Sequence, residues 1–228
     1  MTTAELANYI ETLRIEFQQG ATEKIARQQK AYMRDQFMYF GMKAQERRAA
    51  QKSFLHKTYL PPKSDLNQIV KGLWGQAERD FLYFAMELAF KYKKDWEKED
   101  IQLFEFMAVH KSWWDSIDYI SVKLMGSYFK KFPEQRAESV QKWLDSGNIW
   151  LQRCALLFQL KYKEEIDAKL LSHVIESLLG SKEFFINKAI GWVLREYSRT
   201  NPTWVVSFVE VHTLHNLSKR EALRLLKR

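Results

Sequence analysis

The sequence has little of the residues that usually cross-link or interrupt a fold. Among 228 residues there are one cysteine, four prolines and eight glycines. The single Cys154 excludes an internal disulfide and a cysteine cluster for zinc, and its apolar neighbours indicate packing rather than nucleophilic chemistry. No glycine-rich phosphate-binding loop is present. All four prolines fall between amphipathic runs, where helices are expected to break.

Membrane-directing segments and metal motifs are also missing. No run approaches the roughly 20 apolar residues that a membrane-spanning helix needs. The N-terminal segment MTTAELANYIETL lacks the basic start and apolar core of a signal peptide. The five histidines form no HExxH motif, and the pair His212 and His215 has no third ligand in metal-site order. We therefore expect no metal site, no cofactor and no membrane partner, and a cytoplasmic protein.

What the chain has in excess is positive charge. Lys and Arg number 36 against 28 Asp and Glu, which gives a formal net charge of +8. Hydrophobic residues make up 46% of the chain, so a packed globular protein is expected. The basic surplus favours a polyanionic partner, nucleic acid first and an acidic membrane surface second. A basic but inert surface fits the charge equally well.

Helical patterns run along the whole chain, and no strand is predicted. The predicted helices cover roughly residues 3–19, 21–37, 45–55, 65–73, 77–93, 98–109, 113–130, 133–144, 148–162, 167–179, 182–199, 202–213 and 218–227. Asn148 and Asp167 are predicted N-caps, and Ser218 with Glu221 forms a predicted capping box.

A degenerate repeat runs through these helices. It aligns RDFLYFAMEL (79–88), WWDSIDYISV (113–122), WLQRCALLFQL (150–160) and FINKAIGWVL (185–194). A period near 35–40 residues of paired helices is typical of an α-solenoid. The predicted fold is therefore an all-α superhelix of HEAT-like repeats with a concave basic groove. We expect one domain, 1–228, in which N-terminal helices of residues 1–60 pack on repeats 65–228.

The repeat predicts which side chains share a surface. With a 35-residue offset, Asp118, Arg153 and Lys188 occupy equivalent positions of successive repeats. Trp114 lies one helical turn before Asp118, and Trp192 lies one turn after Lys188. Because equivalent positions of a solenoid line one surface, we expect Trp114, Asp118, Arg153 and Trp192 to face a single groove.

Three segments that contain these residues resemble the signature segments of the AlkD-type DNA alkylation repair glycosylases, a family of HEAT-like repeat proteins. The segments are SWWDSIDYI (112–120), NIWLQRCALLFQLKYK (148–163) and KEFFINKAIGWVLREYSRTNP (182–202), and ERR (46–48) and LSKREAL (217–223) match as well. The resemblance covers nearly the whole chain. It implies removal of positively charged alkylated bases, such as 3-methyladenine and 7-methylguanine, from duplex DNA.

The resemblance also assigns roles to residues of this chain. It implies that Asp118 is the catalytic aspartate, that Trp114 and Trp192 are active-site tryptophans, and that Arg153 contacts phosphate. Tyr32 is the aromatic residue expected near the lesion. One difference is visible, since the family's TPERR turn reads AQERR here. That turn lies near DNA in the family, so the DNA contacts implied in it are those of Lys43, Arg47 and Arg48.

The chemistry of the residues agrees with these roles. An N-alkylated purine is already positively charged, so its departure needs no strong acid, and a fixed carboxylate can stabilise the positive charge that develops on the sugar. Indole faces attract cations by about 0.5–2 kcal/mol. No Schiff-base lysine is implied, so we expect a monofunctional glycosylase of base excision repair that leaves an abasic site. The basic residues expected along the groove are Lys161, Lys163, Lys188, Arg195 and Arg199.

Two other interpretations compete with this one. Most solenoids bind protein, so a non-catalytic HEAT-like scaffold is possible, and so is a DNA-binding protein without catalysis. Asp118 disfavours both, because a carboxylate that faces a phosphate-lined groove weakens DNA binding and is hard to explain without chemistry. A chain of this size and class is expected to act as a monomer.

Overall fold

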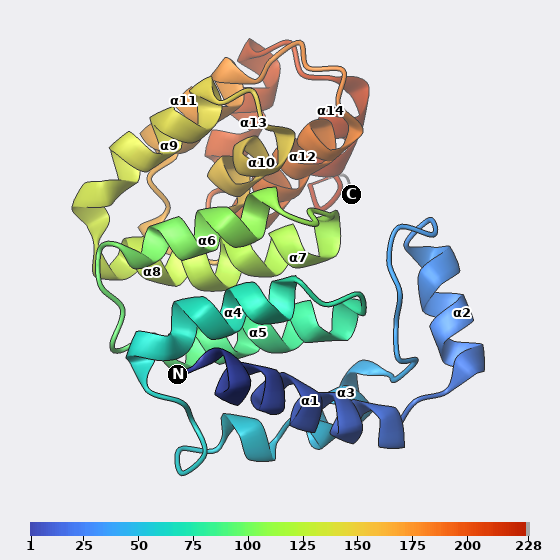
Figure 1. Ribbon diagram of the computed structural model, residues 1–228. Coiled ribbons are helices and arrows are strands. Elements are labelled where there is room, and N and C mark those ends of the chain that lie inside the picture. The colour runs from blue at the N-terminus through green and yellow to red at the C-terminus, as the bar shows by residue number, and fades with distance from the viewer. Residues whose placement is uncertain (227–228) are drawn as a thin grey trace. The chain divides into compact units, whose positions relative to one another are not determined.

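The computed structural model describes residues 1–226, and these residues are almost entirely helical (Figure 1). The α-helices are α1 (Thr3–Gln19), α2 (Glu23–Tyr32), α3 (Ala44–Ala50), α4 (Leu66–Trp74), α5 (Arg79–Lys91), α6 (Asp100–Val109), α7 (Trp114–Tyr119), α8 (Gly126–Lys131), α9 (Arg136–Asp145), α10 (Ile149–Leu157), α11 (Ala168–Ser177), α12 (Phe184–Tyr197), α13 (Pro202–Val211) and α14 (Asn216–Ala222). Short 3-10 helices are η1 (Ser53–Leu55), η2 (Lys63–Asp65), η4 (Pro133–Gln135) and η5 (Lys163–Glu165), and η3 (Ile120–Met125) is a π-helix. One isolated β-bridge joins Met38 to Glu78. The predicted all-α class is confirmed.

The chain divides into two compact units, Met1–Trp96 and a second unit that begins at Glu97. The boundary falls between α5 and α6, within the series of helix pairs. The single domain expected from the sequence therefore stays a prediction, and each unit is described by itself. Within the described residues, no helix is long and apolar enough to cross a membrane.

In the first unit, α1 packs closely against α4. A Cβ atom on Gly72 would lie 3.1 Å from the side chains of Leu6 and Ile10, so the absence of a side chain on α4 lets α1 approach. The helix α2 differs from its neighbours, because none of its residues is buried. Figure 1 shows α2 standing apart from α1, α4 and α5.

The predicted repeat is visible in the spacing of the helix pairs. Their first helices begin at Leu66, Asp100, Arg136, Ala168 and Pro202, so successive pairs begin 32 to 36 residues apart. Contacts between repeats in the second unit have nearly the same separation. Ion pairs join residues 35 or 36 positions apart at 2.9, 2.7 and 2.7 Å: Lys98–Glu134, Lys130–Glu165 and Lys161–Glu196. A period of about 35 residues is therefore confirmed.

Helix caps were predicted with mixed success. The Asn148 side chain accepts hydrogen bonds from two backbone amides at the start of α10, and that of Asp167 accepts one at the start of α11, as expected. The capping box of Ser218 and Glu221 is wrong. The helix α14 begins at Asn216, and Ser218 lies inside it and donates its hydroxyl to the Asn187 carbonyl at 2.8 Å. Ser218 thus bonds to Asn187 of α12 and does not cap its own helix.

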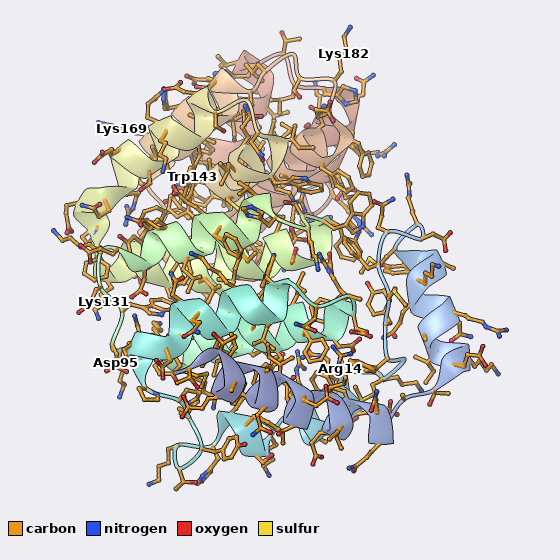
Figure 2. All side chains as sticks on the ribbon, viewed as in Figure 1. Arg14, Asp95, Lys131, Trp143, Lys169 and Lys182 are labelled. Atoms are coloured by element: carbon orange, nitrogen blue, oxygen red, sulfur yellow. The ribbon has the colours of Figure 1, made fainter. Side chains whose placement is uncertain are left out.

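The core of the second unit is rich in aromatic side chains. Trp143 is fully buried, and its Nε1 donates to Glu105 at 2.6 Å. In Figure 2, Trp143 lies within the unit, while the exposed Lys169 and Lys182 project outward. Cys154 is fully buried too, and burial raises the pKa of its thiol. The packing role expected for Cys154 is therefore confirmed.

Candidate functional site

The helical segment that carries Asp118 contains a change of helix type. It was predicted as one helix over 113–130, but α7 gives way to the π-helix η3 directly after Tyr119. The π-helix ends directly before Gly126, where α8 begins. A Cβ atom there would lie 2.6 Å from the Phe158 carbonyl oxygen, so the backbones meet closely at this point. Single turns of π-helix are frequent at functional sites.

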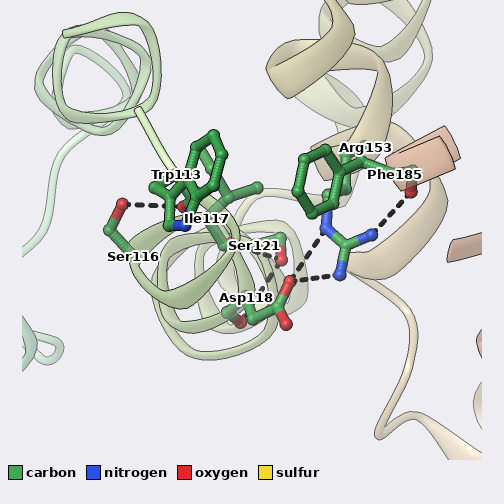
Figure 3. Close-up of polar contacts among 7 residues, drawn as sticks. All are labelled: Trp113, Ser116, Ile117, Asp118, Ser121, Arg153 and Phe185. Atoms are coloured by element: carbon green, nitrogen blue, oxygen red, sulfur yellow. Dashed lines mark hydrogen bonds and ion pairs between the residues drawn. The ribbon is translucent and has the colours of Figure 1, made fainter. Parts of the chain in front are cut away.

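Asp118 and Arg153 form the central contact of the site (Figure 3). Arg153 lies on α10 and is 3% exposed. Its Nε and Nη2 both donate to Asp118 Oδ1, at 2.9 and 2.8 Å, and its Nη1 donates to the Phe185 carbonyl at 2.6 Å. The guanidinium therefore joins α7, α10 and α12 through three charge-assisted hydrogen bonds. Two of its five N–H hydrogens are left for another acceptor.

The Asp118 carboxyl group lies in a half-buried position with an asymmetric set of partners. Its side chain is 22% exposed. Burial raises the pKa of this carboxyl above its ordinary value, and the guanidinium of Arg153 opposes that rise. Both hydrogen bonds from Arg153 end on Oδ1, and none of residues 1–226 donates a hydrogen bond to Oδ2. One oxygen is thus fixed, and the other can face a substrate.

An aromatic cluster lies beside the ion pair. The rings of Trp113, Trp150 and Phe185 meet at centroid distances of 5.0 to 5.9 Å. Each of these residues lies at the start of its helix, α7, α10 or α12. The Phe185 ring centroid is 6.0 Å from the Arg153 guanidinium carbon. The cluster therefore joins the first turns of three helices, α7, α10 and α12, at the end where Arg153 binds the Phe185 carbonyl.

Trp114 and Trp192 flank this centre on different helices. Trp114 lies four residues before Asp118 in α7, so both side chains project from one face of that helix. Trp192 lies seven residues after Phe185 in α12, which places it on the face that carries Phe185. Both tryptophans are half-buried. That they line one groove with Asp118 stays a prediction.

The predicted DNA-contacting residues fall into two groups. Tyr32 ends α2 and is 71% exposed, and Lys43 is exposed directly before α3. The second group consists of cations that pair with a carboxylate of this chain: Arg47 and Arg48 with Glu87, Lys161 with Glu196, and Lys188 and Arg195 with Glu221. Lys163 is exposed, and Arg199 pairs with Glu196 at 3.5 Å.

The AQERR turn keeps a capped helix without the family's Thr-Pro. The backbone amide of Lys43 donates to the Glu46 side chain at 2.8 Å, and α3 then begins at Ala44. Arg47 is buried and donates to Gln51 and Glu87, at 2.8 and 3.0 Å. Of the three cations implied at this turn, Arg47 is therefore the one whose guanidinium packs inside the unit.

Several partners of the predicted residues, in each of the two units, were missed from the sequence. Phe185 supplies a carbonyl to Arg153, and Glu87, Glu196 and Glu221 hold the cations just described. The repeat period could have found Glu196, because it lies 35 residues after Lys161, the separation of Asp118 and Arg153. No comparable spacing relates Glu221 to Arg195.

The fold and the site together define a helical repeat protein with a buried carboxylate–guanidinium pair between two repeats. The family model described as DNA alkylation repair enzyme matches residues 13–226, and the chain belongs to that family. A solved structure described as "Predicted DNA alkylation repair enzyme", from Enterococcus faecalis, is 33% identical. The match covers 91% of this chain and 97% of that one, with a TM-score of 0.86. No curated protein matches significantly.

Proposed function

We propose that this DNA alkylation repair enzyme is a monofunctional DNA glycosylase that removes positively charged alkylated purines, such as 3-methyladenine and 7-methylguanine, from duplex DNA. Family membership supports the role in alkylation repair. The observation that carries the finer proposal is the Asp118 carboxylate. Arg153 holds its Oδ1, while its Oδ2 accepts no hydrogen bond from the described part of the chain.

The reaction needs stabilisation of positive charge more than it needs an acid. The C1′–N bond breaks with its electron pair passing to the base, which leaves as a neutral purine. Positive charge then develops on the deoxyribose, and water adds to C1′ and loses a proton. A carboxylate fixed before the reaction stabilises that charge without reorganisation, and it can accept the proton of the attacking water.

The other residues of the site have supporting roles in this proposal. Arg153 is a positioning residue, because its guanidinium fixes the orientation of Asp118 through two hydrogen bonds. Its two remaining N–H hydrogens can still contact a phosphate. The indole faces of Trp114 and Trp192 attract the cationic nucleotide, by about 0.5–2 kcal/mol each. Asp118, Trp114 and Trp192 all favour positive charge, so the residues that speed the reaction also select for charged lesions.

The proposal includes the nature of the product and the state of the protein. No lysine nucleophile takes part, so an intact abasic site should result, and borohydride should trap no covalent complex with DNA. We expect the protein to act on duplex DNA as a monomer in the cytoplasm. Light scattering of the purified protein measures the monomer directly.

The decisive experiment measures release of methylated purines from duplex DNA that has been treated with a methylating agent. The native chain should release 3-methyladenine or 7-methylguanine. Asp118→Asn should slow release by about 100- to 1000-fold, the effect typical of losing one preorganised electrostatic group. Its affinity for DNA should persist, because the variant removes a negative charge from the DNA-binding face.

Asp115→Asn is the matched control. Asp115 lies in the first turn of α7, the helix that carries Asp118, so the two variants make the same chemical change three residues apart. Release should stay near the native rate in Asp115→Asn. If the native protein binds DNA and releases no base, the chemistry proposed here is wrong and a DNA-binding scaffold replaces it. Equal losses in both variants would point to a general effect of charge.

A further inference from the structure

One carboxylate on α14 holds two cations of α12. Glu221 is buried, its Oε1 lies 3.1 Å from Lys188 Nζ, and its Oε2 pairs with Arg195 Nη1. Burial alone would raise the pKa of Glu221, but the contacts with Lys188 and Arg195 lower it below its ordinary value. The carboxylate therefore remains ionised at neutral pH, and the group of three carries one net positive charge.

The same arrangement recurs around a second carboxylate of the unit. Glu196 accepts a hydrogen bond from Lys161 at 2.7 Å through Oε1, and its Oε2 lies 3.5 Å from Arg199 Nε. Lys161 and Arg199 are both exposed. This group again combines one acid with two cations, and its net charge is +1.

A third example lies in the first unit. Glu87 Oε1 pairs with Arg47 Nη2 at 3.0 Å and with Arg48 Nε at 3.5 Å, while Gln51 donates to Oε2 at 2.6 Å. Three glutamates therefore each hold two cations, and all six cations were expected from the sequence to contact DNA or to line the DNA-binding groove. We call these groups the shared-acid clusters: Glu221 with Lys188 and Arg195, Glu196 with Lys161 and Arg199, and Glu87 with Arg47 and Arg48.

Other ion pairs of the chain have a different composition. Three of them join one cation to one acid, so each pair has a net charge of zero. These pairs are Lys98–Glu134, Lys130–Glu165 and Lys142–Glu105. Neutral pairs hold successive repeats together without creating an anion-binding surface. The shared-acid clusters keep a surplus of positive charge where the cations are partly exposed.

One cluster of the second unit shares a helix face with a proposed active-site tryptophan. Lys188, Trp192 and Arg195 follow i, i+4 and i+7 spacing on α12, so their side chains share one helix face. Glu221 holds the two cations of this face from α14. Glu196, on the same helix α12, holds Lys161, which follows α10.

We propose that Glu221, Glu196 and Glu87 are positioning residues for duplex DNA, and that each fixes two cations side by side to bind backbone phosphates. The proposal rests on the proposed function, since it takes the cations of each cluster to contact DNA. A cation that already has one partner and a fixed rotamer loses less side-chain entropy when it binds a second acceptor. An arginine bound through one nitrogen keeps its other N–H groups for phosphate.

A positioning role for these glutamates predicts a change in DNA affinity opposite to the one expected from net charge alone. Neutralising an acid makes the chain more basic, which by itself strengthens DNA binding. In a shared-acid cluster the same change releases two like charges from their common partner, so they repel each other and separate. Glu221→Gln and Glu196→Gln should therefore weaken DNA binding although each adds one positive charge.

The experiment measures the Kd of a short undamaged duplex by fluorescence anisotropy, at several salt concentrations. Glu221→Gln and Glu196→Gln should each raise Kd about five- to tenfold, the size of one charge-assisted hydrogen bond. Glu165→Gln is the control, because it neutralises the acid of a one-to-one pair. Its Kd should equal the native value or fall below it.

A second measurement separates positioning from general damage. In single-turnover release of methylated purines, the protein concentration at half-maximal rate should rise in Glu196→Gln, while the maximal rate stays within about twofold. Circular dichroism checks that each variant is folded. If Glu221→Gln fails to fold because its acid is buried, Glu196→Gln decides the question, since both of its cations lie at the surface.

Two results would overturn the proposal: native or tighter DNA binding in Glu196→Gln, or a loss in the maximal rate alone. Binding to undamaged DNA does not depend on base release, so the two proposals can fail separately. Weak binding in the shared-acid variants, together with no release by the native protein, would refute the glycosylase and keep the positioning role. Base release that depends on Asp118, together with tight DNA binding in the shared-acid variants, would keep the glycosylase and refute the positioning role.

Discussion

Two ion pairs in the second unit have the same sequence separation and opposite surroundings. Asp118 and Arg153 lie 35 residues apart, and so do Lys130 and Glu165. Both pairs join one helical repeat to the next. The side chains of Lys130 and Glu165 are 41% and 69% exposed, whereas those of Arg153 and Asp118 are 4% and 22% exposed.

The difference shows that the repeat sets the positions of the paired side chains but does not set how deeply they are buried. The repeat places an acid and a base at matching positions, and this alone produces a surface contact worth about 0–1 kcal/mol. At Asp118 the surroundings add a backbone acceptor, the Phe185 carbonyl, and the aromatic cluster of Trp113, Trp150 and Phe185. Burial then restricts the guanidinium to one orientation and shifts the pKa of the carboxyl. An ion pair between repeats thereby holds the Asp118 carboxylate in one fixed orientation.

The largest expected effect comes from removing the buried cation. Arg153→Met should lower the free energy of unfolding by about 3–5 kcal/mol, because it leaves the Asp118 carboxylate and the Phe185 carbonyl without their donor. Glu165→Gln should change it by no more than about 1 kcal/mol. Cys154, the single thiol of the chain, is buried beside Arg153, so its labelling by a thiol reagent reports opening of the second unit.

Labelling of Cys154 should become about 150- to 5000-fold faster in Arg153→Met, in proportion to the change in the opening equilibrium. It should stay near the native rate in Glu165→Gln. Similar rates in the two variants would mean that burial adds nothing to the pair, and the contrast between the two contacts would be lost.

A second prediction concerns the pH dependence of base release. The ionised form of Asp118 is the form that stabilises positive charge, so the rate should fall as the pH falls. Because burial raises the pKa of Asp118, the midpoint should lie above the ordinary value for aspartate. Below the midpoint, the rate should drop about tenfold per pH unit. Single-turnover release at saturating protein measures this, with protein-free DNA as the control for acid depurination.

In Asp118→Asn, the rate of base release should no longer fall at this midpoint, because the Asn side chain carries no proton that titrates. A native profile that is flat down to the ordinary pKa of a carboxyl group would assign the charge stabilisation to another residue. Asp115→Asn should keep the fall in rate at low pH but move its midpoint to lower pH, because the charge of Asp115 adds to the rise in the pKa of Asp118.

Much of the site follows from the sequence because the repeat imposes a period. The 35-residue offset related Asp118 to Arg153, and these residues form a direct ion pair. The start of α10 was also predictable, since the Asn148 cap is a local contact between neighbours in the sequence. The family resemblance, confirmed by the match over residues 13–226, then attached a chemistry to these positions.

Glu196 could have been found from the repeat period, but two other missed features depend on contacts that have no local or periodic signal. The π-helix after Tyr119 ends directly before Gly126, where the Phe158 carbonyl approaches the backbone, and only the folded chain defines that contact. The predicted capping box at Ser218 failed because Glu221 faces Lys188 and Arg195 on a different helix. Side chains were thus assigned to their nearest neighbours in sequence, whereas burial gave them partners from α12.

A smaller effect is expected when the half-buried Asp118 is made neutral. Asp118→Asn should lower the free energy of unfolding by about 1 kcal/mol, because the Asn oxygen can still accept both hydrogen bonds from Arg153. The sign of the pKa shift agrees. With a raised folded-state pKa, the contribution of Asp118 to stability is present below its unfolded-state pKa and is lost as the pH rises through the folded-state pKa. The fold thus tolerates a neutral group here.

Labelling of Cys154 at neutral pH measures this change as well. The rate in Asp118→Asn should lie far closer to the native rate than to that of Arg153→Met. A loss as large as that of Arg153→Met would show that the attraction between the two charges, and not the hydrogen bonds of Arg153, holds the repeats together.

The smallest expected effect lies in the exposed pair. A double-mutant cycle on Lys130→Met and Glu165→Gln should give a coupling energy of about 0.2–0.5 kcal/mol at low salt, because both groups are solvated and screened. The coupling should fall toward zero in 1 M salt, where the Debye length is about 3 Å. Lys130 also lies 4.7 Å from the ring centroid of Tyr162, so Lys130→Met can destabilise the unit without any coupling to Glu165. A coupling above about 1 kcal/mol that survives high salt would show that the repeat spacing alone can produce a strong contact, and burial would no longer explain the difference between the two pairs.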